Sequence, residues 1–336
     1  MKPKLSICIP TYNRSKHLSN CLQSLILNKN IHSQEIQVCV SDNCSIDDTE
    51  MVVRHAQEKI DIVYHKNEEN IGIPRNFLNV VDMASGEFVW LIGDDDLLIP
   101  TALEDLLEII NQNNNVDFFY INSFHLTSEY VFDHPQPFDT INLPIDMERF
   151  SLHSRDGQMN FMDLIDPSVS FDFLGGMFLS VFRRKNWIQN KNVLDRNAIY
   201  DKKTFSHFDN TFPHVKIFAT AFSNSKAYFN STPLSVCLSG AREWAPMYPF
   251  VKSVRLVEAL HEYRKNGLPY RNYWRCKNFA LRNFIPDIGY TILHKKESGY
   301  EYLKPLSLIV RNCLYPEFYL SFFRYIIRKF KGTFYL

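Results

Sequence analysis

Short apolar runs alternate with helix-like segments along the first hundred residues, and polar clusters follow several of these runs. The strand-like runs are Leu5–Ile9, Ile36–Val40, Ile60–His65 and Phe88–Ile92, and stretches with apolar residues at helical spacing separate them. This alternation predicts an α/β fold around a mostly parallel sheet. In such sheets ligands bind beyond the carboxyl ends of the strands, so we expect the functional residues there.

The alternation becomes less regular after Pro100. We predict a helix over 102–110, a strand over 118–122, irregular chain over 127–160, and helices over 214–222, 251–265 and 273–285. No Gly- or Ser-rich linker marks a sharp boundary between domains. We expect a main α/β domain over residues 1–250 and a basic, aromatic-rich helical extension over residues 251–336.

The charge of the chain is balanced but unevenly distributed. It carries 37 Lys and Arg against 37 Asp and Glu, which argues against a dedicated nucleic-acid-binding protein. Residues 1–100 contain 9 basic and 14 acidic side chains, whereas residues 251–336 contain 16 basic and 6 acidic ones. We therefore expect the two ends of the chain to meet different partners, with no nucleic acid among them.

The cysteines and the apolar segments indicate in which cellular compartment we expect the protein. The seven cysteines form no CxxC pair and no zinc-finger spacing, and Cys8 and Cys39 lie inside apolar runs. Free thiols of this kind are typical of a reducing environment. The N-terminus lacks an apolar stretch of signal-peptide length, and no window of about 18 apolar residues occurs in the chain. We expect a cytoplasmic protein whose contact with a membrane is peripheral.

Three consecutive aspartates, Asp94, Asp95 and Asp96, follow the fourth predicted strand. Two unit charges 4 Å apart repel by roughly 1 kcal/mol in water, and by several times more where screening is poor. A cation compensates such a cluster, and oxygen ligands without nearby His or Cys favour Mg²⁺ or Mn²⁺. The simpler alternative is a cap on the helix that begins near Pro100. The position of the cluster after a buried strand favours the metal site.

Polar residues at other strand ends carry weaker signals. Asp42 and Asn43 form either a turn or an acceptor for the N–H of a nucleotide base, with Asn43 ordering the loop. The segment Pro10–Arg14 offers an aromatic face, hydroxyl groups and the cation of Arg14. Arg75, near the start of a helix, is placed either to meet a phosphate or to lie on the surface.

Four segments together carry a resemblance to a known family. They are Ser6–Arg14, Val40–Thr49, Asn70–Asn76 and Gly93–Pro100. In this order and spacing they resemble glycosyltransferase family 2, well over roughly residues 4–110 and weakly over residues 170–245. The resemblance implies the nucleotide-sugar-binding GT-A fold and a transferase that inverts the anomeric carbon. Within the family the chain is similar to bacterial O-antigen and capsule sugar transferases of the abequosyltransferase type.

The resemblance implies roles for the residues of the first three segments. Pro10, Thr11 and Tyr12 match the loop that packs on the nucleotide. Asp42 matches the carboxylate that reads the base, and Arg75 lies where the family contacts the nucleotide or its phosphates.

The acidic cluster matches the metal-binding motif of the family, with one departure. Aligning the residues that follow it puts Gly93 where many members have the first Asp. The resemblance therefore implies Asp95 as the direct metal ligand. Asp96 is a further candidate ligand, and Asp94 is a candidate for contact with the nucleotide.

The reaction also requires a general base, because the acceptor hydroxyl loses its proton as it attacks the anomeric carbon. The family places this base in an acidic pair after a segment ending in Phe-Arg. Here Val181–Arg184 matches that segment, but no Glu-Asp pair follows. We assign the base to Asp209, for which a helix cap is the alternative interpretation. His207 and Asp172 are the next candidates.

Residues further along the chain are candidates for contact with the sugars. Arg242 and Trp244 could close over the diphosphate or the donor sugar, and an ordinary packed loop is the alternative. Asp172 is a candidate for the same region on the donor or acceptor side.

The C-terminal segment Tyr315–Leu336 combines nine aromatic residues with four basic residues and a single acid, Glu317. It fits either a helix packed against the main domain or an interfacial helix on an anionic bilayer. A lipid-linked acceptor would make the second useful, so we expect peripheral contact with the inner face of the bacterial cytoplasmic membrane.

These inferences predict an enzyme of two parts, with a GT-A catalytic domain over residues 1–250. It would use Mg²⁺ or Mn²⁺ to move a sugar from a nucleotide-sugar donor to a lipid-linked glycan in O-antigen or capsule synthesis. One alternative is a nucleotidyltransferase, which requires a Gly-rich phosphate loop that Pro10–Arg14 lacks. The other is a non-catalytic module that binds nucleotide sugars or glycans, which loss of the acidic cluster would favour.

Overall fold

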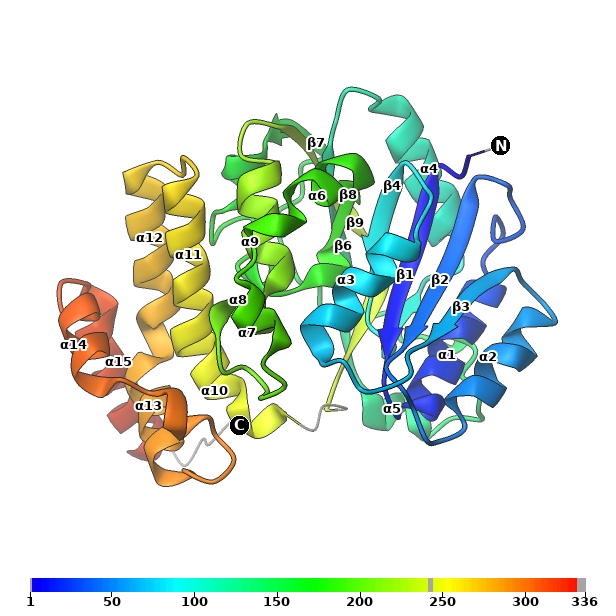
Figure 1. Cartoon of the computed structure of the whole chain (residues 1–336). Coiled ribbons are helices and arrows are strands. Elements are labelled where there is room, and N and C mark those ends of the chain that lie inside the picture. Colours follow the sequence, from blue (N-terminus) through cyan, green and yellow to red (C-terminus); the bar gives the residue numbers. More distant parts are fainter. Residues whose placement is uncertain (1, 241–243, 331–336) are drawn as a thin grey trace.

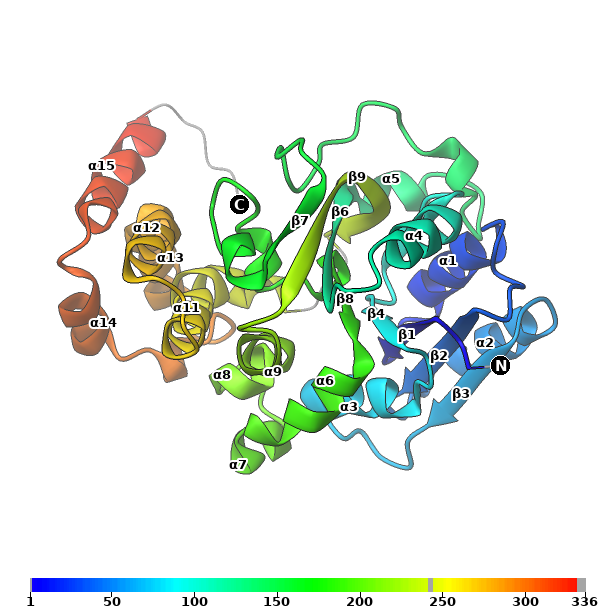
Figure 2. The same ribbon diagram turned by 90° about the horizontal axis from the view of Figure 1, so that it is seen from above.

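The computed structural model describes residues 2–240 and 244–330, and its centre is a nine-stranded sheet with helices on both faces (Figures 1 and 2). In their order across the sheet the strands are β3 (Ile62–Lys66), β2 (Ile36–Asp42), β1 (Leu5–Thr11), β4 (Phe88–Leu91), β8 (Ser180–Arg183), β6 (Phe118–Thr127), β9 (Lys226–Ser239) and β5 (Asp96–Leu98). The remaining strand, β7 (Gly157–Asn160), pairs with β9.

Helices connect the strands and then continue as a C-terminal stack. The helices before residue 240 are α1 (Ser15–Ile26), α2 (Thr49–Gln57), α3 (Ile73–Met83), α4 (Ala102–Gln112), α5 (Ser128–Phe132), α6 (Arg184–Asn190), α7 (Arg196–Tyr200), α8 (Phe208–Thr211) and α9 (Pro213–Ala221). Those after it are α10 (Tyr248–Phe250), α11 (Leu256–Lys265), α12 (Tyr270–Ala280), α13 (Phe284–Leu293), α14 (Pro305–Asn312) and α15 (Pro316–Phe330).

The first four predicted strands all form, and β1 to β4 pair in parallel as expected. Two of them are longer than the apolar pattern indicates. β1 extends to Thr11 and β2 to Asp42, because these two residues are partners in the parallel register. Both polar side chains are buried, and it is their hydrogen bonds, not hydrophobicity, that keep them there.

The second half of the sheet contains strands of both directions. β8 is antiparallel to both β4 and β6, so β6 and its parallel neighbour β9 run in the direction of β1. The carboxyl ends of β1, β2, β4, β6 and β9 therefore lie at one edge of the sheet. The segment 127–160 contains α5 and β7 in addition to irregular chain, and its Val131 and Phe138 pack on Val236 and Leu238 near the end of β9.

The C-terminal helices stack beyond α9 at one end of the sheet (Figure 1). They share the hydrophobic core of the sheet, which is continuous from Leu5 to Tyr315 and includes Val257, Leu260 and Tyr263 of α11. The predicted boundary at residue 250 therefore does not separate two hydrophobic cores. Over the part of the chain that the structure describes, no helix is long and apolar enough to cross a membrane.

Candidate active site

The acidic cluster lies at the carboxyl edge of the sheet, in direct contact with the end of β1. Asp94, Asp95 and Asp96 are all buried, and Asp96 is the first residue of β5, paired with Cys237 of β9. Thr11 Oγ1 donates a hydrogen bond to Asp94 Oδ2 at 2.8 Å. The cluster therefore belongs to the junction of three strands, and the alternative of a simple helix cap does not describe its position.

Gly93 allows the carboxylates to turn back over the chain. Its backbone N–H donates to Asp96 Oδ2 at 2.6 Å. A Cβ atom on Gly93 would lie 2.6 Å from Asp95 Oδ1 and 3.1 Å from Asp96 Oδ2. A larger residue at this position would push these two carboxylates away, which gives a physical reason for glycine where the family motif has an acid.

Arg14 is a counter-ion of the acidic cluster. Its Nη1 lies 2.9 Å from Asp94 Oδ1, and its Nη2 lies 3.1 Å from Asp95 Oδ2. The guanidinium is partly exposed while both carboxylates are buried, so a strong ion pair is held at the edge of the site. Arg14 is the cation that the sequence offers after the first strand as a candidate for the nucleotide, and the structure pairs it with the aspartates.

The side chains of the acidic cluster have the chemistry to bind a hard divalent cation. The cluster offers carboxylate oxygens, which are the donors that Mg²⁺ and Mn²⁺ prefer. Within residues 2–240 and 244–330, no three His, Cys, Asp or Glu side chains converge as a preformed cage. A cation bound at Asp95 and Asp96 would therefore need further ligands, which a diphosphate and water supply in sites of this kind.

Asp42 at the end of β2 is buried, and both of its carboxylate oxygens accept hydrogen bonds. Oδ1 accepts from the Ser45 backbone N–H and Oδ2 from the Tyr64 hydroxyl, each at 2.8 Å. Burial, and then the neighbouring carboxylate, raise the pKa of Tyr64 well above its ordinary value, so the hydroxyl remains a donor. The turn anticipated from the sequence is thus present, and the same carboxylate is held rigidly at the edge of the sheet.

Asn43 orders the loop after β2, as the sequence analysis expects. Its Nδ2 donates to Asn70 Oδ1 at 2.9 Å, and its Oδ1 accepts from the Ile71 N–H at 2.8 Å. Its own backbone N–H donates to Thr11 O at 2.9 Å. The backbone and side chain of Asn43 together therefore join the ends of β1 and β2 to the loop before α3.

The end of β1 presents an aromatic ring to solvent. Pro10 is buried in the strand, whereas Tyr12 is 42% exposed. The next residue, Asn13, has a positive φ of 52°, and its side chain accepts from the Ile46 N–H at 2.8 Å. This turn holds the Tyr12 ring at the surface, where a flat base could stack on it.

Arg75 lies in the first turn of α3 and is directed toward the second half of the chain. Its guanidinium stacks on the Tyr200 ring of α7 at 4.3 Å. Arg196 lies over the same ring at 5.6 Å. α3 also contacts α8, so Arg75 connects the nucleotide half of the predicted site with the segment that carries Asp209.

Asp209 is buried in the short helix α8 and is held by two donors. Its Oδ2 accepts from Lys216 Nζ at 2.7 Å and from the Asp195 N–H at 2.6 Å. His207, not Asp209, occupies the N-cap position of α8, so the cap interpretation of Asp209 does not apply. His207 is itself largely exposed, 3.5 Å from Asp201.

The structure also describes two of the remaining predicted residues, Trp244 and Asp172. Trp244 packs edge-on against Phe205 with ring centroids 5.1 Å apart, whereas Arg242 lies outside the described residues. Asp172 is exposed, and its charge acts on His125 near the end of β6. Burial lowers the pKa of His125, and Asp172 partly opposes that effect.

Phe205, the partner of Trp244, is held by a buried arginine that sequence reasoning did not single out. Phe205 has a positive φ of 57°, and its carbonyl accepts from Arg255 Nε at 3.2 Å and Nη2 at 3.0 Å. Arg255 Nη2 also donates to Ser206 O at 2.6 Å, and its Nη1 pairs with Glu258 at 2.7 Å. Arg255 therefore fixes the chain just before α8.

Asn76 is a second residue that the sequence reasoning missed. It is buried, donates to Ser41 O at 2.9 Å and accepts from the Ser41 hydroxyl at 2.7 Å. An Asn on the apolar face of a helix was the available signal. Tyr64 and Arg255 offered no comparable signal, since their partners Asp42 and Phe205 are 22 and 50 residues away in the sequence.

Comparison with known proteins shows which family the chain belongs to. The family model described as Glycosyl transferase family 2 matches residues 6–175. The abequosyltransferase RfbV of Salmonella typhimurium is 27% identical over 69% of this chain and 66% of its own length. The GalNAc(5)-diNAcBac-PP-undecaprenol beta-1,3-glucosyltransferase of Campylobacter jejuni is 37% identical over 33% of this chain and 35% of its own length. The matches thus leave a third or more of each relative uncovered.

Solved structures show the same fold. The crystal structure of Staphylococcus aureus TarS in complex with UDP aligns with a TM-score of 0.56 at 15% identity, covering 99% of this chain and 93% of TarS 1-349. The mannosyltransferase PcManGT of Pyrobaculum calidifontis, in complex with GDP-Man and Mn²⁺, aligns with a TM-score of 0.51 at 14% identity, covering 97% of this chain and 86% of its own. RfbV and the Campylobacter jejuni enzyme are both named as sugar transferases. The family model covers half of the chain, and this match shows that the chain belongs to glycosyl transferase family 2.

Proposed function

We propose that this glycosyltransferase moves a sugar from a nucleotide-sugar donor to a hydroxyl of a lipid-linked glycan, with inversion at the anomeric carbon. The observation that carries the proposal is the contact of Thr11 and Arg14 with the buried acidic cluster at the carboxyl edge of the sheet. Donor complexes of two structural relatives, TarS with UDP-GlcNAc and PcManGT with GDP-Man, support a nucleotide sugar as substrate.

The donor would lie on the ends of β1, β2 and β4. Tyr12 would stack on the base, with Pro10 shaping the loop beneath it, and Asp42 would accept from a base N–H. That N–H would share the carboxylate with Ser45 and Tyr64, which already hold it in place. Asp94 would contact the ribose, and Arg75 would face the phosphates if it leaves its stack on Tyr200.

Asp95 and Asp96 would hold Mg²⁺ or Mn²⁺, supported by the complex of PcManGT with Mn²⁺. Such a cation, when bound, supplies positive charge where the leaving diphosphate develops negative charge. Arg14 would then have a second role. Its pairing with Asp94 and Asp95 keeps the carboxylates in position before the donor arrives, and the partly exposed guanidinium is near enough to the surface to meet a phosphate.

Asp209 would act as the general base. Lys216 and the Asp195 N–H both hold Oδ2, and within the described residues no hydrogen bond involves Oδ1. Oδ1 would accept the proton of the acceptor hydroxyl as that hydroxyl attacks the anomeric carbon. Asp172, Trp244 and Arg242 would contact the donor sugar or the acceptor, with His207 as the reserve base.

The acceptor is proposed from the relatives. RfbV is named as an abequosyltransferase, and the name of the Campylobacter jejuni enzyme includes a PP-undecaprenol-linked glycan. We infer a lipid-linked acceptor in the synthesis of O-antigen, capsule or a similar surface polysaccharide. The protein would then work at the inner face of the bacterial cytoplasmic membrane, with residues 1–250 as its catalytic part and residues 251–336 as a helical extension.

A calorimetric titration of nucleoside diphosphates and nucleotide sugars, with and without Mn²⁺, tests the donor site in wild type and Asp95→Ala. We expect one nucleotide to bind more tightly with Mn²⁺, and this gain to disappear in Asp95→Ala. Met51→Ser on the exposed side of α2 serves as a control that keeps the gain. Absence of binding by every nucleotide would overturn the proposed donor site.

A further inference from the structure

Two arginines from distant parts of the chain lie on one tyrosine ring. The guanidinium of Arg75 in α3 is 4.3 Å from the centre of the Tyr200 ring, and that of Arg196 is 5.6 Å from the same centre. The two guanidinium carbons therefore lie no further apart than the sum of these distances. Among the residues that the structure describes, neither guanidinium makes an ion pair or a hydrogen bond.

The arrangement follows from the sequence of α7 and from the packing of α3. Arg196 and Tyr200 are four residues apart in α7, so they share one face of that helix. α3 contacts α7 and α8, which brings Arg75 to the same ring (Figures 1 and 2). Tyr200 is 50% exposed. The ring therefore holds two cations near the surface, where their N–H groups are available as donors.

Three acids on the neighbouring segments already have other partners. Glu69, in the loop before α3, pairs with Lys202 at 3.2 Å. The Asp195 carboxylate accepts from a backbone N–H of α7 at 3.0 Å, and Asp201 accepts from the Ser206 hydroxyl at 2.8 Å. Two cations that share a ring repel each other, and an anion between them would relieve that repulsion.

The two arginines lie between the two halves of the proposed site. Arg75 directly precedes Asn76, which is hydrogen-bonded to the end of β2 at 2.9 Å. Arg196 directly follows Asp195, whose backbone N–H donates to Asp209 Oδ2 at 2.6 Å. One arginine is thus next to the donor edge of the sheet, and the other is next to the candidate base. An anion bound to both would lie where donor and acceptor meet.

The chemistry of the two side chains identifies the class of ligand. A guanidinium offers paired N–H donors in a plane, and these match the oxygens of a phosphate group. A diphosphate has two such groups, so it can accept from both arginines at once. Both proposed substrates can supply one, since a nucleoside diphosphate carries the donor sugar and the name of the Campylobacter jejuni relative includes a PP-undecaprenol-linked glycan.

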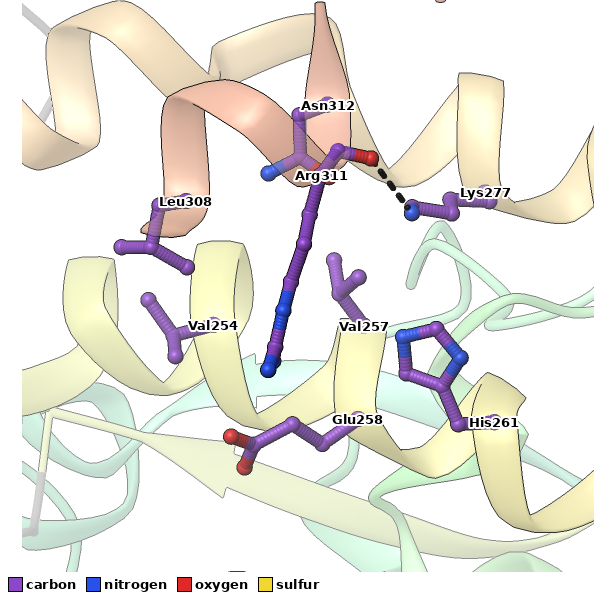
Figure 3. A pocket seen from close by; sticks show the side chains of 8 residues that line it. All are labelled: Val254, Val257, Glu258, His261, Lys277, Leu308, Arg311 and Asn312. Atoms are coloured by element: carbon purple, nitrogen blue, oxygen red, sulfur yellow. Dashed lines mark hydrogen bonds between the residues drawn. The ribbon is translucent and has the colours of Figure 1, made fainter. Parts of the chain in front are cut away.

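Lys277 and Arg311 of the C-terminal stack do not form such a site. Figure 3 shows both at a small pocket that Glu258 also lines. Lys277 Nζ donates to the Arg311 carbonyl at 3.0 Å, and the Glu258 carboxylate would repel a phosphate. The volume of about 20 Å³ has room for about one water molecule. This pocket is therefore too small and too acidic for a diphosphate.

We propose that Arg75 and Arg196 together bind a diphosphate group of one of the two substrates. The Tyr200 ring holds the two cations near each other before the anion arrives. The inference deepens the proposed function and rests on it for the identity of the substrates. It adds Arg196 and Tyr200 to the site, and no motif of the sequence indicates either of them.

Calorimetric titration of the full chain with inorganic pyrophosphate, without a divalent cation, tests the site. We expect wild type to bind pyrophosphate, more weakly as salt is raised. Arg196→Gln and Arg75→Gln should each weaken the affinity by about tenfold, since each removes charge-assisted hydrogen bonds. Equal affinity of wild type and Arg196→Gln would overturn the proposal, and so would the absence of pyrophosphate binding by wild type.

A matched variant gives the control. Arg271 is an exposed arginine of α12 in the C-terminal stack, and Arg271→Gln removes the same charge there. This variant should bind pyrophosphate as wild type does. A loss in Arg271→Gln as large as that in Arg196→Gln would overturn the proposal, because the affinity would then depend only on the net charge of the protein.

A second titration distinguishes the two sources of the diphosphate. Pyrophosphate is added to protein that is already saturated with the nucleoside diphosphate found in the donor titration. If the group belongs to the donor, pyrophosphate no longer binds, and Arg196→Gln loses affinity for the nucleoside diphosphate but not for the monophosphate. If it belongs to the acceptor, pyrophosphate still binds, and Arg196→Gln binds both nucleotides as wild type does.

The pyrophosphate titration also separates this inference from the proposed function. A protein that binds a nucleotide with Mn²⁺, but whose affinity for pyrophosphate does not change in Arg196→Gln, refutes only the arginine site. A protein that binds pyrophosphate through Arg196 but binds no nucleotide refutes only the donor site.

Discussion

At the residue scale, Asp209 shows how one carboxylate can be both buried and available. Lys216 and the Asp195 N–H compensate Oδ2 within α8 and its neighbours. Burial of a charge without such partners would cost several kcal/mol. The pairing therefore permits a carboxylate at this depth, and the remaining oxygen defines where an acceptor hydroxyl would have to lie.

Asp209→Asn should abolish most of the transferase activity and leave the donor site intact. Asn keeps the shape and still accepts from the Asp195 N–H, but it cannot take a proton. We expect kcat to fall by about 10²–10⁴-fold with little change in donor affinity. Sugar transfer and nucleotide titration measure the two effects. A variant with wild-type kcat would exclude Asp209 and direct attention to His207 and Asp172.

At the scale of elements, the residue that caps the start of α11 contacts the segment before α8. Arg255 is buried and donates to the carbonyls of Phe205 and Ser206, in the loop between α7 and α8. Phe205 in turn packs against Trp244. The C-terminal stack is thus coupled to the segment that carries Asp209.

Arg255→Met should destabilise the protein and misplace this loop. It leaves two buried carbonyls without their donor and Glu258 without its cation, so we expect a loss of about 3 kcal/mol in the free energy of unfolding. Arg264→Met, at an exposed position in α11, is the matched control. Denaturant titration measures stability, and kcat against donor KM tests positioning. Equal behaviour of the two variants would contradict the role of Arg255.

His214 in α9 predicts how the stability of the protein depends on pH. Burial lowers the pKa of His214 from its ordinary value of 6.5 to about 3. Above about pH 6.5 the ring is neutral in both folded and unfolded chains. Between about pH 6.5 and 3 the unfolded chain binds a proton that the folded one does not, so stability falls by about 1.4 kcal/mol per pH unit.

His214→Leu should remove that part of the pH dependence. Unfolding free energies measured by denaturant titration from pH 8 to pH 4.5 should decline less steeply in the variant than in wild type. At pH 8 the His is neutral in both states, so the difference there reports only the change in packing. Parallel curves for the two proteins would show that His214 does not titrate as expected.

At the scale of the whole molecule, the sheet and the C-terminal helices share one core. Val257, Leu260 and Tyr263 are buried, and α11 packs on α9. Removing residues 251–336 would expose the side of α9 that α11 covers. The extension is therefore part of what holds the fold together, whatever it contacts outside.

A chain ending at residue 250 should not keep the cooperative unfolding of the full chain. We expect one transition for the full chain by circular dichroism, and for the shortened chain a broad one with binding of a hydrophobic dye. A shortened chain that melts cooperatively within a few degrees of the full one would show that residues 1–250 fold independently.

Much of the candidate site could be located from the sequence because its residues follow strands that the apolar pattern reveals. Thr11 and Asp42 end parallel strands and Asp94 follows a third, β4, and parallel strands bring their carboxyl ends together. The pairing of Arg14 with two aspartates and of Asp42 with Tyr64 could not be predicted, because these contacts depend on side-chain positions between distant segments.

The sequence by itself determined the α/β class, the parallel strands β1 to β4 and the acidic cluster after β4, since each depends on local periodicity or on a short motif. Only the tertiary structure decided that β8 reverses direction and brings β6 and β9 to the same edge, that Gly93 makes room for two carboxylates, and that Arg255, at the start of α11, holds the loop before α8. The physical reason is the distance along the sequence over which each kind of interaction acts. Backbone propensity and hydrophobic spacing act over a few residues, whereas burial, charge pairing and close packing act between residues that the folded chain brings together.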